Sequence, residues 1–113
     1  MAWFKVDDTL AFHGKTVAAG NAAMGLWVRA GSWSMQTLTD GYIPAAIVRQ
    51  LGSETQAAKL VNAGLWDVAP DGWTFHEWGE RQPSAEAVRT DRANARDRTR
   101  RAREAAEKKR KGL

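Results

Sequence analysis

Two histidines are the only side chains in this 113-residue sequence whose ordinary pKa lies near neutrality, and they are the first candidates for acid–base chemistry. Neither His13 nor His76 belongs to a catalytic or metal-binding pattern, because the sequence has no cysteine, no third histidine and no ordered carboxylate cluster. Glu77 and Glu80 flank Trp78 and are expected to be solvated. Since no Ser-His-Asp spacing, phosphate-binding loop or zinc motif is present, we expect a non-enzymatic protein without a metal or other cofactor.

Phosphate binding is the second chemistry that the residue types allow, and the C-terminal part of the chain indicates it. Residues 84–113 carry eleven basic and five acidic residues, whereas residues 1–83 carry six basic and eight acidic residues. Many of the cations recur every three or four residues, so a helix would gather them in one stripe. This pattern predicts an electrostatic arm for double-stranded DNA. Its predicted contact residues are Arg89, Arg92, Arg96, Arg100, Arg103, Lys108, Lys109, Arg110 and Lys111.

Helical structure is favoured along this basic tail by seven alanines, which have the highest intrinsic helix propensity. Val88 is the only large apolar residue of the tail before Leu113, so the tail lacks the seam of a coiled coil. The alternative to a DNA-binding arm is a solvated, partly frayed helix. Acid-before-base pairs at i, i+4 spacing support the helix, namely Asp97 with Arg101, Glu104 with Lys108 and Glu107 with Lys111.

A polar helix face in the middle of the chain is the third candidate site. Ser53 and Gln56 match a capping box, which predicts a helix that starts just after Ser53. Thr55, Lys59 and Asn62 then share one face, with Gln56 beside them. Gln and Asn can pair with adenine, and Lys can bind guanine or phosphate, so these four residues could contact DNA. The alternative is an ordinary solvent-exposed face, because one lysine supplies little positive charge.

The remaining elements follow from caps, turns and periodicity. A long helix with Asn21 as its N-cap carries apolar residues on more than one face, which is typical of a central, largely buried element. A Pro-Asp-Gly turn at residues 70–72 predicts a β-hairpin. The full prediction is a strand at 3–6, helices at 15–19 and 22–38, a short strand at 42–43, helices at 44–51 (with Pro44 as the first helical residue) and 54–63, strands at 65–68 and 73–76, and a tail helix from about residue 84.

This order places two short helices directly before a hairpin, and it predicts an α+β fold. We expect a mostly helical winged helix-turn-helix domain with a small β-hairpin wing over residues 1–82. Residues 83–113 form the basic Arg/Ala-rich tail, helical or partly disordered. The alternative is an α+β domain whose helix pair only packs the core.

Six tryptophans precede residue 79, and we interpret them mostly as core because each can bury about 150–250 Å². They outnumber what a small core obviously needs, so some could be exposed anchors of a protein interface. The hairpin residues Trp66, Trp73 and Trp78 are the candidates for that interface.

Several segments together resemble a known family. They are residues 3–7, 25–33, 39–44, 60–66, 71–78 and 82–84, and they include Gly-Leu-Trp-Val-Arg, Thr-Asp-Gly-Tyr-Ile-Pro and Asn-Ala-Gly-Leu-Trp. They are similar to small helix-turn-helix and replication-initiation-type proteins of bacteriophages that infect actinobacteria. The resemblance implies a winged-helix domain followed by an Arg-rich segment, and a role in phage replication or its regulation in the host cytoplasm.

Two partner classes are therefore expected from the sequence. The first is double-stranded DNA, bound by the basic tail and positioned by the helix at 54–63 and the hairpin tip. The second is a host protein, such as a component of the replication machinery, which the phage protein would modulate. The N-terminal residues lack a signal-peptide pattern and no long apolar run occurs, so we expect a cytoplasmic protein with no membrane association and no small-molecule substrate.

Overall fold

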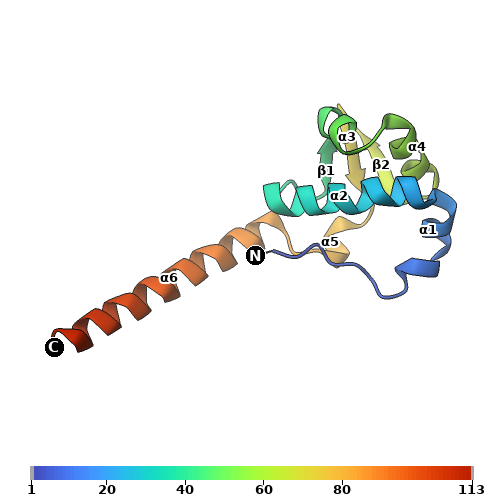
Figure 1. The fold of residues 1–113 in the computed structure, drawn as a ribbon. Coiled ribbons are helices and arrows are strands. Elements are labelled where there is room, and N and C mark those ends of the chain that lie inside the picture. Colours follow the sequence, from blue (N-terminus) through green and yellow to red (C-terminus); the bar gives the residue numbers. More distant parts are fainter. Residues whose placement is uncertain (1, 113) are drawn as a thin grey trace.

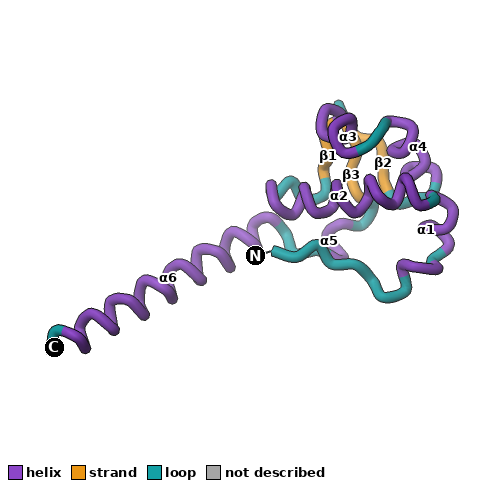
Figure 2. Tube along the Cα trace, viewed as in Figure 1, coloured by secondary structure: helices purple, strands orange, loops and turns teal. Residues whose placement is uncertain are grey.

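The computed structural model describes residues 2–112, and it contains one long projecting helix attached to a mixed helical and β-sheet body (Figure 1). In this body several helices lie beside a small sheet, and a long loop leads from the N-terminal end to the first helix (Figure 2). The elements in chain order are η1 (Leu10–Phe12), α1 (Gly14–Ala19), α2 (Asn21–Thr37), β1 (Tyr42–Pro44), α3 (Ala45–Leu51), α4 (Glu54–Asn62), β2 (Trp66–Ala69), β3 (Gly72–Phe75), α5 (Trp78–Arg81) and α6 (Ala85–Arg110).

The predicted α+β class is correct: the body is mostly helical, with one three-stranded antiparallel sheet of order β1-β3-β2. The predicted hairpin is β2 and β3, which pair with Trp66 opposite Phe75 and Ala69 opposite Gly72. Each strand is shifted by one residue or less from the predicted bounds. β1 is the short strand expected at Tyr42, and it pairs with β3 so that Pro44 lies opposite Gly72. A Cβ atom at Gly72 would clash with the Ile43 carbonyl oxygen, so this close strand approach requires glycine.

Helix α2 is the central element that the sequence predicts. Its inner face buries Ala23, Leu26, Ala30 and Met35, while Val28 on the opposite face is exposed. Gly31 also lies on the buried face, directly under the ring of Phe4, where a Cβ atom would overlap that ring. The glycine that weakens the helix intrinsically therefore lets an aromatic side chain approach its backbone.

Helices α3 and α4 are joined through Gly52 and Ser53, as predicted. Ser53 Oγ accepts a hydrogen bond from the Gln56 backbone N–H at 3.2 Å, and Gln56 Oε1 accepts one from the Ser53 backbone N–H at 3.0 Å. The predicted capping box is therefore present. Gly64 follows the helix with a φ of 80°, which confirms its predicted place after the C-cap.

The N-terminal segment is not the strand that the sequence predicts. Residues 2–7 have no regular secondary structure. Lys5 instead pairs with a side chain, because its N–H donates to Gln82 Oε1 at 2.9 Å and its carbonyl oxygen accepts from Gln82 Nε2 at 2.7 Å. Phe4 then packs against Trp27, with ring centroids 5.0 Å apart, and against Trp78 at 5.9 Å. At Lys5, the backbone groups that a strand would pair with a neighbour are satisfied by the Gln82 side chain.

Two predicted caps are displaced by one residue. Asn21 is the first residue of α2, and Gly20 is its N-cap with a φ of 83°. Pro44 is the N-cap of α3 and the last residue of β1, not the first helical residue, because strand pairing holds it in an extended conformation. His13 has a local role that the sequence analysis did not assign, since its side chain caps α1 by accepting the Lys15 N–H at 3.2 Å.

The hydrophobic core extends beyond the predicted boundary at residue 82. Ala85 and Val88, on the first turn of α6, are 6% and 5% exposed, and Val88 belongs to the core cluster. The Ala85 N–H also donates to Asp40 Oδ1 at 2.7 Å, so the body caps this helix from outside. The chain therefore has two regions, a body of residues 2–88 and an arm of residues 89–110.

Candidate nucleic-acid interface

The arm has the geometry of a free-standing rod. At about 1.5 Å per residue, the 26 residues of α6 span about 39 Å. The described chain measures 65 × 30 × 21 Å, with a radius of gyration of 19.0 Å. A globular chain of this length would have a radius of gyration of about 13 Å. The excess arises because α6 points away from the body (Figure 1). Within the arm, every side chain except Asp97 is exposed.

Charge pairing along the arm leaves most cations available. Asp97 pairs with Arg101 at 3.1 Å and also contacts Arg100, and Glu107 pairs with Lys111 at 2.9 Å. These pairs confirm two of the three predicted i, i+4 contacts. Glu104 is the exception, because it lies 3.9 Å from Arg100 and makes no ion pair with Lys108. Within residues 2–112, the cations of α6 without an ion-pair partner are Arg89, Arg92, Arg96, Arg98, Arg103, Lys108, Lys109 and Arg110.

The predicted DNA-reading face of α4 is only partly available. Thr55, Lys59 and Asn62 are exposed as expected. Gln56 does not present its side chain for DNA as expected. Its side-chain oxygen accepts a hydrogen bond from the Ser53 backbone N–H at the start of α4, and its side chain is partly buried. On the neighbouring helix, Arg49 pairs with Glu54 at 3.2 Å. Lys59 is therefore the only cation on the face of α4, which provides little attraction for phosphate.

The hairpin tip carries negative charge. Residues 65–77 contain no lysine or arginine, and Asp71 is exposed at the turn. At the end of the hairpin opposite to this turn, His76 lies between two carboxylates, with Nδ1 3.0 Å from Asp67 and Nε2 3.3 Å from Glu77. A DNA contact at this tip would bring Asp71 close to phosphate, so the hairpin offers no electrostatic support for the predicted positioning role.

The tryptophans suspected of forming a protein interface are mostly inside the body. Trp66 is 1% and Trp78 8% exposed, and Trp73 is partly buried against the core. The interface prediction is therefore wrong for Trp66 and Trp78 in this conformation, because both pack against the Phe75 ring, at centroid distances of 5.4 and 5.1 Å. The exposed tryptophan is Trp3, at 72%. The segment around Trp3 has no regular apolar spacing, so the exposure of Trp3 could not be predicted from the sequence.

No group of three or more His, Asp or Glu side chains within residues 2–112 is arranged to hold a metal ion. The pKa of Asp7 is lowered because its Oδ1 accepts hydrogen bonds from the Thr9 backbone N–H at 2.9 Å and from the Thr9 hydroxyl at 2.7 Å. The Arg81 guanidinium, 3.3 Å from Asp7 Oδ2, lowers this pKa further.

The candidate segments do not form one surface. α4 and the arm lie at opposite ends of the molecule (Figure 1). The electrostatic component of the predicted interface is therefore spatially separate from the helix that could read bases. None of the helices described between residues 2 and 112 combines the length and apolar character required to cross a bilayer.

Comparisons with known proteins add no further assignment. A scan against protein-family models, a search of curated proteins and a search of solved structures each found no match.

Proposed function

We propose that this protein binds double-stranded DNA through the arm, and that the body is a winged-helix domain acting in phage replication or its regulation. The observation that carries the proposal is the segregation of charge. Residues 84–113 have a net charge of +6, on a helix exposed to solvent, whereas residues 1–83 have a net charge of −2. A rod of unpaired arginines and lysines can neutralise several phosphates and release their counterions, which supplies affinity without reading sequence.

The order of the elements supports the winged-helix component. α2 is followed by a short strand, two short helices and a hairpin, and β1 joins the hairpin in the order β1-β3-β2. The second helix of a helix-turn-helix pair is the one that enters a major groove, and here this helix is α4. Its exposed Thr55, Lys59 and Asn62 could make a few contacts. We assign most of the affinity to the arm because α4 offers a single cation.

Duplex binding at several salt concentrations tests the proposal. A fluorescently labelled duplex of about 20 base pairs would be titrated by anisotropy, with an expected dissociation constant of about 10⁻⁴–10⁻⁶ M at physiological salt. The logarithm of the association constant should fall by about 0.9 per phosphate contact for each unit of log salt. A chain ending at Thr90 has a net charge of −2 and should lose most of this binding.

Two matched double variants locate the contact on the arm. Arg92→Gln with Arg96→Gln removes two charges from the predicted stripe, and Arg98→Gln with Arg101→Gln removes the same charge from other faces of the helix. The first pair should reduce the salt slope by about two units, and the second should reduce it less. No binding at low salt, or a flat salt response, would exclude the DNA-binding proposal.

A second candidate function is binding of a host protein. It is favoured by the acidic hairpin and by two exposed aromatic side chains, Trp3 at 72% and Phe12 at 92% exposure. Such side chains are the usual anchors of protein interfaces. A pull-down from host lysate with and without nuclease separates the candidates. Recovery of a stoichiometric protein after nuclease treatment, lost when Trp3 and Phe12 are changed to Ser, would support this second function over DNA binding.

A further inference from the structure

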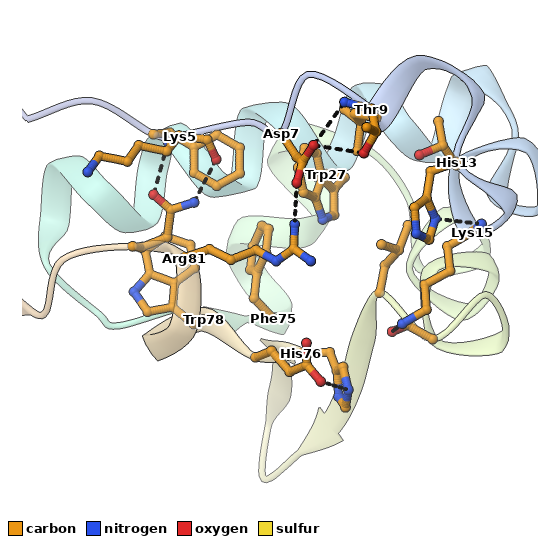
Figure 3. Close-up of a pocket in the computed structure, with 17 residues that line it drawn as sticks. Lys5, Asp7, Thr9, His13, Lys15, Trp27, Phe75, His76, Trp78 and Arg81 are labelled. Atoms are coloured by element: carbon orange, nitrogen blue, oxygen red, sulfur yellow. Dashed lines mark hydrogen bonds and ion pairs between the residues drawn. The ribbon is translucent and has the colours of Figure 1, made fainter.

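A cavity of about 220 Å³ lies beneath the N-terminal segment, away from the arm. Its walls come from that segment, from α1 and α2, from the end of β3 and from α5. In Figure 3, His13 and Lys15 lie on one side of this space, across from Arg81 and the aromatic side chains. The sequence patterns predict no small-molecule site here, because the residues that line the cavity are far apart in the chain.

Aromatic rings make up much of the cavity wall. Phe4, Trp27, Phe75 and Trp78 all line it. The Phe4 and Phe75 centroids are 5.8 Å apart, and the Trp27 and Phe75 centroids are 5.7 Å apart. A wall built largely of aromatic rings favours a flat aromatic ligand.

The polar lining is incompletely satisfied on the α1 side. Thr16 lines the cavity, and its Oγ1 is buried with no hydrogen-bond partner among the described residues. A buried hydroxyl without a partner is uncommon in a folded protein, and a local rearrangement of this wall around a bound ligand is one way to satisfy it. Lys15, the preceding residue of α1, also lines the cavity, and its ammonium donates to the Gly64 carbonyl oxygen at 3.3 Å. Two further N–H groups of this ammonium remain for a ligand.

The charges around the cavity favour an anion. The lining carries three lysine or arginine side chains, Lys5, Lys15 and Arg81, against two carboxylates. Asp7 pairs with Arg81 at 3.3 Å, and Glu77 lies 3.3 Å from His76 Nε2. Lys15 makes no ion pair with any residue between 2 and 112, and Lys5 on the far wall makes none either. Lys15 is therefore the charged group next to the unsatisfied hydroxyl that can accept a negative partner.

The volume limits the size of the ligand. An apolar cavity of about 150 Å³ accommodates benzene, so this larger space has room for one bicyclic ring with a short substituent. It is smaller than the roughly 300–1,000 Å³ of sites for drug-sized molecules. We infer that the cavity is a binding site for a small planar aromatic acid, whose ring lies against Phe4, Trp27 and Phe75 and whose carboxylate contacts Lys15 and Thr16.

Three probes of the same ring test this site. They are indole-3-acetate (an anion), indole-3-ethanol (neutral) and tryptamine (a cation). Binding is followed by NMR on ¹⁵N-labelled full-length protein, in which each tryptophan gives an indole N–H signal. The signals of Trp27 and Trp78, which line the cavity, should shift on titration, whereas those of Trp33 and Trp66 should not. Indole-3-acetate should bind with a dissociation constant of about 1 mM or below, and about tenfold more tightly than the alcohol.

Variants at the polar wall separate ligand contact from folding. Lys15→Met keeps most of the side-chain stem, and it should abolish the preference for the acid while the alcohol still binds. Thr16→Val keeps the shape and should weaken the acid severalfold. Arg89→Met, on the arm, removes the same charge outside the cavity and should leave the preference unchanged. The indole N–H spectrum of each free variant reports whether the fold is retained.

Three results would overturn the inference. One is the absence of shifts at Trp27 and Trp78 with all three probes at millimolar concentration. Another is equal binding of the acid, the alcohol and the amine. The third is a preference for the acid that survives in Lys15→Met and disappears in Arg89→Met. None of these results depends on whether the arm binds DNA.

Discussion

The body buries large apolar side chains, whereas the arm exposes charged and small ones. In the body, large apolar side chains meet in one cluster that includes Leu26, Ile43, Leu60 and Trp66. In the arm, every side chain except Asp97 is exposed, and arginine and alanine predominate. Most of the stability must therefore come from residues 2–88, and most of the positive charge lies beyond them. The contrast implies that stability and nucleic-acid affinity can be changed separately.

Trp66→Ala should produce the largest effect and tests the body side of this comparison. Trp66 is 1% exposed and packs between Trp73 and Phe75, at centroid distances of 6.4 and 5.4 Å. Removing a buried tryptophan leaves a cavity and should lower the free energy of unfolding by about 3–5 kcal/mol, enough to unfold much of a marginally stable domain. Urea denaturation followed by circular dichroism measures this change.

Trp3→Ala is the matched control, because Trp3 is 72% exposed. Its effect on the free energy of unfolding should stay within about 0.5 kcal/mol. Equal destabilisation by the two substitutions would contradict the assignment of Trp66 to the core and of Trp3 to the surface.

Two truncations locate the border between the regions. A chain ending at Thr90 retains Val88 and should unfold cooperatively with nearly full stability. A chain ending at Pro83 loses the burial of Val88 and the hydrogen bond from the Ala85 N–H to Asp40. It should be less stable by about 2–4 kcal/mol. Thermal unfolding of both chains measures the difference, and a border at residue 82 would instead make them equally stable.

Gln82→Ala tests how the N-terminal segment is attached to the body. The Gln82 amide makes two hydrogen bonds to the Lys5 backbone, at 2.9 and 2.7 Å, and the residue is buried. Their loss should cost about 1–3 kcal/mol and should accelerate hydrogen exchange at the Lys5 amide. Gln50→Ala, at an exposed position of α3, is the control and should change neither quantity. Unchanged exchange at Lys5 would show that Phe4 packing alone holds the segment.

The smallest expected effect is a pH dependence at Asp7. Its pKa is lowered from 3.8 in the folded protein, first by the Thr9 backbone N–H, then by the Thr9 hydroxyl, and less by Arg81. Because the folded pKa lies below the unfolded one, this carboxyl stabilises the fold above its ordinary pKa, and the contribution is lost as the pH falls through the folded value. NMR titration should show that Thr9→Ala raises the pKa of Asp7 more than Arg81→Met does. The reverse order would mean that the Arg81 charge lowers the pKa of Asp7 more than the Thr9 hydroxyl does.

Local sequence patterns determined several features on their own. The capping box of Ser53 and Gln56, the glycine after α4, the hairpin around residues 70–72 and the exposed, charged tail helix all agree with the structure. Each depends on hydrogen bonds or side-chain spacings within about four residues, so the information is present in a short stretch of sequence. The charge division between body and arm is also a property of sequence alone.

Only the tertiary structure decided which side chains are buried and which are engaged in hydrogen bonds to distant residues. The burial of Trp66 and Trp78 and the exposure of Trp3 depend on contacts with distant segments, and so does the pairing of Lys5 with Gln82. The extension of the core to Val88 and the cavity beneath the N-terminal segment also arise from contacts between distant segments. A tryptophan or a glutamine has similar local preferences whether it is buried or exposed. Its environment is fixed when elements far apart in the chain pack together, because burial and cavity shape are sums over those long-range contacts.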